Sequence, residues 1–211
     1  MAVYFKGPLG GFSGSIGPVV GSSWKDLDVM RSQPGPRKGD PSPAQLDQQA
    51  KFALAGGFVN DAKNLLAATT AGGGTMTGFN VAMQQVLNDA ITGASNAWSI
   101  DYSKVLLSRG GLFNAFGFSV ASTAAGKISW SWQAGSGLSG EDPTDRAVLI
   151  AYSEDLGRMA YTLSGAARSA GTDALTIPAF SGKQVHTWLA FISANGKEIS
   201  DSEYTGHVTV Q

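Results

Sequence analysis

Few residues of this chain have the types and spacing that support chemistry, and its two histidines come first. His186 and His207 both fall on expected strands near the C-terminal end, where they could be neighbours across a strand pair. Two imidazoles without a cysteine or a fixed carboxylate make a poor metal site, because zinc sites gather three or four such ligands. A hydrogen-bonded structural role is therefore favoured over metal binding.

An acidic run is the second candidate. Glu141, Asp142 and Asp145 could supply oxygen ligands to a weakly bound Ca²⁺ ion. The run lacks the regular ligand spacing of a calcium-binding loop, so a solvated turn is the favoured interpretation. The sequence therefore predicts no metal site.

The stretch 135–140 reads Gly-Ser-Gly-Leu-Ser-Gly and matches the glycine string of dinucleotide-binding sites. In such sites a helix follows the string, because its N-terminal amides and dipole hold the pyrophosphate. Here the acidic run and another expected strand follow instead, so we interpret the string as a loop between strands. Ser13 and Ser139 each miss the centre of a Gly-x-Ser-x-Gly elbow by one position. Without a nucleophile, a base and oxyanion donors, we expect a protein that is not an enzyme and needs no cofactor.

Aromatic side chains allow one further activity, which is stacking against sugars. Trp98, Trp130, Trp132 and Trp188 could form such a platform. Trp130 and Trp132 lie in the register of a buried strand face, and large aromatic side chains dominate cores and interfaces. Packing is therefore the favoured role of these residues, and a carbohydrate-binding or adhesion module is the alternative function.

The composition narrows the class of protein. The 211 residues include 28 Gly and no Cys; 43% are hydrophobic, 15% are charged, and the formal net charge is −1. The apolar fraction excludes a wholly disordered chain, and the lack of Cys excludes disulfides and thiolate metal sites. A charge near zero argues against direct nucleic-acid binding. The apolar runs are too short for a membrane span, and we expect no cleaved signal peptide at the start.

Residues 1–43 concentrate glycine and proline, and we expect an extended N-terminal arm with a connector. Residues 24–31 predict a short strand or hairpin limb, and residues 33–43 predict a connector rich in helix and strand breakers. Such an arm either lies on its own domain or docks on a neighbouring chain, because an apolar terminus must be tied down somewhere. The large apolar residues of the arm are Phe5, Leu9, Phe12, Ile16, Val19, Val20 and Trp24.

Residues 44–99 predict a helical hairpin. Ser42 and Gln45 fit the capping box of a first helix that extends to about Ala68. Apolar residues at helical spacing predict a second helix over 79–91. Two helices cannot build a large core by themselves, so their apolar faces must cover another element.

From about residue 100 the hydrophobic period changes from 3.6 to 2, and residues 100–211 predict an antiparallel β-sandwich. The predicted fold class is therefore α+β, with an arm, a helical hairpin and a C-terminal sandwich. The expected strands cover residues 104–108, 116–122, 127–133, 146–153, 158–164, 174–177, 184–193 and 207–210.

Two of these strands are apolar on both faces. In residues 184–192, Leu189 and Phe191 point to one side, whereas Trp188 and Ile192 point to the other. The sandwich core can cover one face, and the helical hairpin, the arm or another subunit must cover the second. We therefore place Trp188 and Ile192, together with the apolar residues of the arm, in a candidate assembly interface.

Two resemblances add to this interpretation. Residues 127–211 resemble a fibronectin type III or immunoglobulin-like module. Ile128-Ser-Trp-Ser-Trp132 is similar to strand B of that fold, 174–178 to strand E, and Val185–Ser193 to strand F. The turn at 195–196 is similar to the F–G turn. Over its whole length the chain resembles an uncharacterised family of short Bacteroidota proteins. The stretches that carry this likeness are 5–14, 17–24, 28–32 and 42–52.

Taken together, these patterns predict a non-enzymatic structural subunit that self-assembles. We expect the arm to pack, partly as an added strand, on a neighbouring copy. Repetition of that head-to-tail contact would build a ring, a shell or a filament. The expected partners are copies of the same chain and other structural proteins of the assembly. By analogy of fold, the expected setting is a phage virion or a cell-surface filament.

Overall fold

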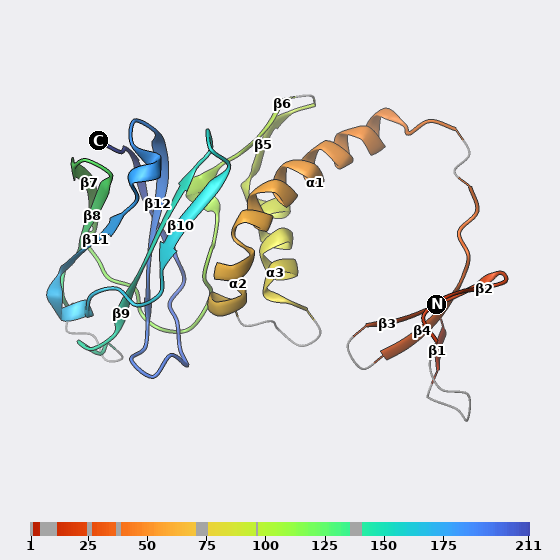
Figure 1. Cartoon of the computed structure of the whole chain (residues 1–211), viewed down its shortest axis with the longest axis horizontal. Coiled ribbons are helices and arrows are strands. Elements are labelled where there is room, and N and C mark those ends of the chain that lie inside the picture. Colours follow the sequence, from red (N-terminus) through yellow and green to blue (C-terminus); the bar gives the residue numbers. More distant parts are fainter. Residues whose placement is uncertain are drawn as a thin grey trace. The chain divides into compact units, whose positions relative to one another are not determined.

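The computed structural model describes residues 2–4, 12–24, 27–36, 39–70, 76–95, 97–135 and 141–211, with only the backbone given for 2–4 and 24. The chain divides between Ser42 and Pro43 into two units. We call residues 1–42 the N-terminal unit and residues 43–211 the body (Figure 1).

The N-terminal unit folds into a four-stranded antiparallel sheet. Its strands are β1 (Ala2–Tyr4), β2 (Gly14–Ile16), β3 (Val19–Trp24) and β4 (Leu27–Ser32), in the spatial order β1-β4-β3-β2. Strands β2, β3 and β4 pair in succession, and β1 lies beside β4, an arrangement of the Greek key type. The sequence predicted an extended arm with a strand or hairpin limb over 24–31, and β4 agrees with that limb. The rest of the arm differs from an extended chain because it folds back at Gly17. This residue has a φ of +57° and opens the two-residue turn between Ile16 and Val19, where glycine is favoured.

Three helices begin the body: α1 (Pro43–Asp61), α2 (Lys63–Thr69) and α3 (Gly78–Gln85). The predicted hairpin of helices is present, although its first member breaks at Ala62 into α1 and α2. Thr77 caps α3 by accepting a hydrogen bond from the Asn80 amide at 3.3 Å. No helix in the described part of the chain is long and apolar enough to cross a bilayer.

The helices connect to the sandwich through short elements. They are the π-helical turn η1 (Val86–Ala90), the hairpin of β5 (Ile91–Ala94) and β6 (Ala97–Ile100), and the 3₁₀ turn η2 (Tyr102–Lys104). The strand expected over 104–108 is absent, because the amides of Leu107 and Ser108 donate to Ser202 Oγ rather than to a strand.

Seven strands form the β-sandwich. One sheet has the order β11-β8-β7, and the other has the order β10-β9-β12-β13. In chain order these strands correspond to A, B, C, C′, E, F and G, with A, B and E in one sheet and C′, C, F and G in the other. Immunoglobulin-like domains likewise separate B and E from C, F and G. The strands are β7 (Ser119–Ala124), β8 (Lys127–Ser131), β9 (Arg146–Ser153), β10 (Arg158–Thr162), β11 (Thr172–Thr176), β12 (Gln184–Ile192) and β13 (Glu203–Thr209). Two 3₁₀ turns, η3 (Arg168–Ala170) and η4 (Pro178–Phe180), lie in the connections.

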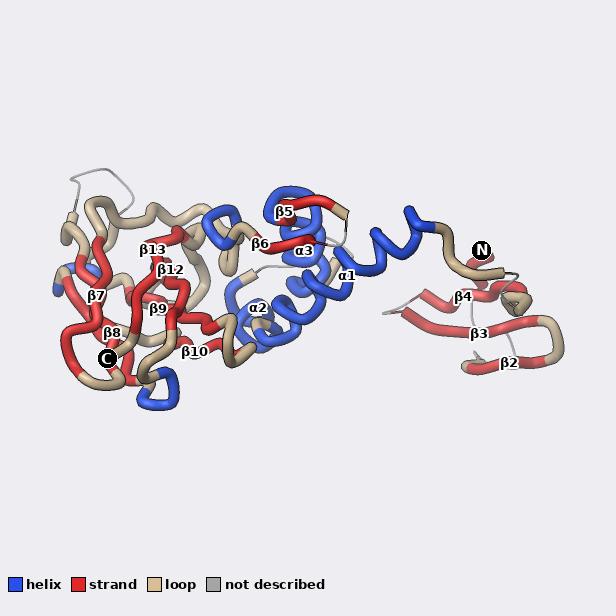
Figure 2. The backbone as a smooth tube through the Cα atoms, turned by 90° about the horizontal axis from the view of Figure 1, so that it is seen from above, coloured by secondary structure: helices blue, strands red, loops and turns tan. Residues whose placement is uncertain are grey.

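Strands β9 and β12 separate two hydrophobic cores. Leu149 and Leu189 pack with Trp130 between the two sheets. Ile150 and Trp188 point the other way and pack against the helices, including Phe58 of α1. Figure 2 shows the three helices gathered beside the sheet that contains β9 and β12. The helices therefore form a third layer of the body.

This third layer settles which element covers the second apolar face. Trp188 is fully buried beneath the helices, and Ile192 packs at the edge of the same core. Ile192 is only partly buried. Trp188, however, is not available to a second subunit, so we correct the sequence interpretation and remove it from the candidate interface. The physical reason is that the helical hairpin itself needed an apolar partner, and the sheet of its own chain supplies one.

Candidate functional site

The two histidines lie side by side across the β12–β13 pair, as the sequence predicted. His186 pairs directly with His207, and their ring centroids are 6.3 Å apart. His186 Nδ1 shares a hydrogen bond of 2.9 Å with Tyr204 Oη, and its ring stacks on that of Tyr102 at 4.0 Å. Burial lowers the pKa of His186, and the neighbouring His207 lowers it further. The pair is thus built into the joint between the sandwich and the helical layer.

The acidic run is divided between two structural roles. Asp142 Oδ1 accepts hydrogen bonds from the Thr144 amide and hydroxyl, which closes a turn. Asp145 is buried, and its Oδ2 lies 3.2 Å from both Nε and Nη2 of Arg168. Within the described ranges there is no group of three or more potential metal-ligating side chains. The Asp145 carboxylate therefore serves an ion pair, whereas the sequence interpretation placed it in a solvated turn.

The buried Arg168 side chain makes several polar and aromatic contacts. Its Nη2 donates to the carbonyl of Phe113 at 2.6 Å, and its guanidinium lies 4.0 Å from the ring centroid of Phe191. Its own carbonyl accepts the indole N–H of Trp132 at 2.8 Å. A buried pair that is also hydrogen-bonded fixes geometry, because the loss of either partner leaves an uncompensated charge.

The glycine string at 135–140 is followed by a strand and not by a helix. Residues 136–140 lie outside the described residues, so only Gly135 can be placed. The next regular element is β9, a strand. A helix N-terminus, which the chemistry requires, does not follow.

The tryptophans with described side chains have packing roles. Trp130, Trp132 and Trp188 are buried. Trp98 is half-buried, its Nε1 donates to Asp47 Oδ1 at 2.8 Å, and Lys51 Nζ lies 3.9 Å from its ring centroid. These contacts favour packing over a sugar-stacking platform.

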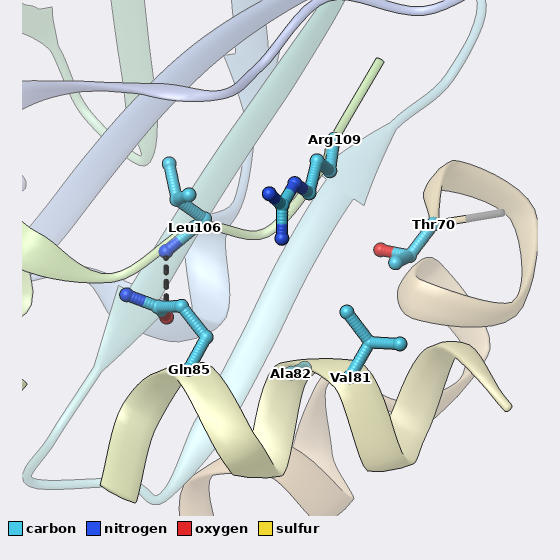
Figure 3. Close-up of a pocket in the computed structure, with 6 residues that line it drawn as sticks. All are labelled: Thr70, Val81, Ala82, Gln85, Leu106 and Arg109. Carbon is cyan, nitrogen blue, oxygen red and sulfur yellow. Dashed lines mark hydrogen bonds between the residues drawn. The ribbon is translucent and has the colours of Figure 1, made fainter. Parts of the chain in front are cut away.

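A small cavity lies between α3 and the segment that follows η2. Figure 3 shows Gln85 reaching across it, with its Oε1 accepting the Leu106 amide at 3.2 Å. The other lining residues include Thr70, Val81 and Arg109. Its volume is about 10 Å³, which is room for about one water molecule. The cavity is too small to bind an organic ligand.

A second cavity of about 340 Å³ opens at one end of the sandwich. It is lined by the loop 110–114 and by residues 201–203. Asp201 Oδ1 accepts the Gly110 amide at 2.9 Å, and Asn114 Nδ2 donates to the carbonyls of Leu189 and Asp201. Burial raises the pKa of Glu203, which starts β13. This end of the body is acidic and shaped by hydrogen bonds.

The predicted interface residues of the arm fall on both faces of the N-terminal sheet. Ile16 and Val19 are paired and share one face, on which the Phe12 ring lies against Gly21; Val20 lies on the other face. Phe5 and Leu9 lie outside the described residues, and only the backbone of Trp24 is described. The structure therefore brings part of the predicted set onto one small sheet, and places Trp188 in a core of the body with Ile192 partly buried at its edge.

Comparison with known proteins identifies the family. The model of a family of unknown function (DUF6266) matches residues 11–206. The chain belongs to this family. The likeness to an uncharacterised family that was inferred from the sequence is thus confirmed. No curated protein matches the DUF6266 chain.

One solved structure similar to the DUF6266 chain is the fibronectin type III domain of human collagen alpha-1(XX) chain. The two share 14% sequence identity with a TM-score of 0.36, over 47% of this chain and 87% of that domain. The sandwich assignment rests on the sheet order of the DUF6266 chain itself.

Sequence analysis missed the Arg168–Asp145 pair and the cavity at the end of the sandwich. The two members of the pair are 23 residues apart and lie in separate loops, so no local spacing marks them. The two halves of the cavity come from 110–114 and 201–203, which only the fold brings together. The available signal was Phe113, a large apolar residue in a glycine-rich stretch between the expected strands 104–108 and 116–122.

Proposed function

We propose that this protein is a non-enzymatic structural subunit whose N-terminal unit joins it to another copy. The observation that carries the proposal is that no side chain described in the N-terminal unit is buried. A single sheet needs a covered apolar face to be stable, and a unit of about 40 residues rarely achieves this alone. The N-terminal sheet thus needs a partner surface.

The body, in contrast to the N-terminal sheet, has buried cores of its own, which supports its role as the stable part to which that sheet is attached. Both hydrophobic cores lie entirely within residues 43–211, so the body has what it needs to fold. A stable body with an appended, incompletely buried sheet is the arrangement expected of a subunit that donates one element to its neighbour. A head-to-tail contact of this kind extends into a ring or a filament, as in a virion or on a cell surface.

The test is the mass of the particle in solution. We expect the full chain, with a subunit mass of 21.8 kDa, to sediment as a multiple of that mass, and residues 43–211 to sediment as a monomer. The melting temperature of the shorter chain checks that the body is folded. A shorter chain that assembles as fully as the whole protein contradicts the proposal, as does a full chain that stays monomeric at high concentration.

A further inference from the structure

The cavity at the end of the sandwich carries a surface with a definite chemical character. We call the side chains of Phe113, Phe116, Asp201 and Glu203 the acidic end. Asp201 and Glu203 line the cavity, and neither is in an ion pair in the part of the chain that the structure describes. Phe113 lines it as well, and Phe116 lies three residues further along the same loop. The two rings are 47% and 51% exposed. The Phe113 ring beside two carboxylates that are in no ion pair, with a second exposed ring on the same loop, fits an apolar partner that carries a positive charge.

The acidic end is held in place before any partner arrives. The loop that carries Phe113 is fixed by the hydrogen bond from Arg168 to its carbonyl. The Gly110 amide orients the Asp201 carboxylate, and the Asn114 amide group joins the loop to the Leu189 carbonyl of β12. A preorganised surface binds more tightly, because less conformational entropy is lost when the contact forms.

The N-terminal unit has the complementary charge. Residues 1–42 contain five Lys or Arg and three Asp, a net charge of +2, whereas residues 43–211 contain ten Lys or Arg and thirteen Asp or Glu, a net charge of −3. The two units of different copies therefore attract each other, whereas two N-terminal units repel.

One face of the N-terminal sheet matches the acidic end in detail. The strand register places Val20 opposite Arg31, and Ser22 opposite Val29, on the same side of the sheet as Leu27. Leu27 and Arg31 are exposed, and Val20 and Val29 are only partly buried. We call Val20, Leu27, Val29 and Arg31 the Arg31 face. It presents three apolar side chains beside one cation, and within the described residues of the unit no second layer covers it.

We propose that the Arg31 face of one copy docks on the acidic end of a second copy. This inference rests on the proposed function and names the surface that receives the N-terminal unit. The apolar side chains pack on the two phenylalanine rings, and the guanidinium pairs with the carboxylates of Asp201 and Glu203. The contact joins different surfaces on the two copies, so it is heterologous and repeats from copy to copy.

Charge reversal in the full-length protein tests this docking. We expect Glu203→Lys and Arg31→Glu, each alone, to raise the concentration for half-assembly by about tenfold or more, since each places like charges in contact. The double variant Arg31→Glu with Glu203→Lys restores the opposite charges and recovers assembly toward that of the unmodified chain. Glu198→Lys is the matched control, because it makes the same charge change at an exposed position outside the acidic end, and it leaves assembly unchanged.

The outcomes separate this inference from the proposed function. If both single variants assemble like the unmodified chain while removal of residues 1–42 still abolishes assembly, the docking surface is wrong and the proposed function stands. Failure of the double variant to recover, with both single variants folded by circular dichroism, also contradicts the pairing.

A crosslinking measurement does not depend on the charge variants. The full chain is prepared with the photocrosslinker benzoylphenylalanine in place of Phe116. It is mixed with isotope-labelled copies of the unmodified chain, and the mixture is irradiated. We expect crosslinks from position 116 to residues 19–32 of labelled copies. Crosslinks confined to the same copy show that the body binds its own N-terminal unit and overturn the proposal, and so does the absence of crosslinks to residues 19–32.

Discussion

The N-terminal unit and the body are both rich in β-structure, but they differ in how they bury it. The N-terminal unit is one sheet, and none of its described side chains is buried. The body stacks two sheets and a helical layer, so that β9 and β12 are covered on both faces. The contrast places both described hydrophobic cores in the body, and it is the reason for our proposal that the N-terminal unit depends on a partner.

The largest expected effect is the loss of stability of the body in the variant Trp188→Ala, which tests the difference in burial between the two units. Trp188 is fully buried between β12 and the helices, and its ring contacts those of Tyr102 and Tyr204. Truncation of a buried large aromatic side chain costs about 3–5 kcal/mol, measured by chemical denaturation of residues 43–211. Ile16→Ala in the full chain is the matched change in the N-terminal unit, where the side chain is 62% exposed. A similar loss of unfolding free energy in the two variants would contradict the proposed difference between the body and the N-terminal unit.

A smaller loss is expected from Ser202→Ala, which tests the joint between the helical layer and the sandwich. The buried Ser202 Oγ accepts the amides of Leu107 and Ser108 at 2.7 and 3.3 Å. Buried donors without an acceptor cost about 1–3 kcal/mol. Ser119→Ala is the control, because its hydroxyl bonds to Ser131 in an exposed position, and we expect a change below about 0.5 kcal/mol. Equal effects would show that the joint is not held by Ser202.

The strands and contacts of the two units also show which parts of the fold could be predicted from the sequence. The strand around Trp130 followed from its alternation, and the two-sided apolar pattern of β12 correctly predicted a second covering layer. The sequence did not identify the element that forms this layer, because hydrophobic periodicity indicates that a strand face is buried but not which element covers it. Contacts between distant segments, such as Arg168 with Asp145, have no local signature. Of the N-terminal sheet, the sequence predicted only a strand or hairpin limb over 24–31, which overlaps β4, because the frequent glycines before it suggested an extended chain.

The smallest effect is expected from pH. Burial and the neighbouring His207 lower the pKa of His186 in the folded body. An unfolded chain has a histidine pKa of about 6.5 and binds the proton more readily, so the body loses stability as the pH falls below that value. We expect the melting temperature of residues 43–211 to fall from pH 8 to pH 5.5, and to fall less in His186→Phe.

The His207→Gln variant sharpens the pH prediction. It removes the second imidazole while His186 keeps its contacts with Tyr102 and Tyr204. Its pH dependence should lie between those of the unmodified body and of His186→Phe. Identical pH profiles for all three chains would show that this pair does not respond to pH in the folded body.

The most direct test of the central claim is hydrogen exchange of the full chain at several protein concentrations. If the N-terminal sheet depends on a neighbouring copy, the amides of β2 to β4 are protected at high concentration and exchange rapidly after dilution. The amides of β9 and β12 stay protected throughout, because their cores lie within one body. Equal protection of the N-terminal sheet at every concentration would contradict the account, since it would show that the sheet is stable without a partner.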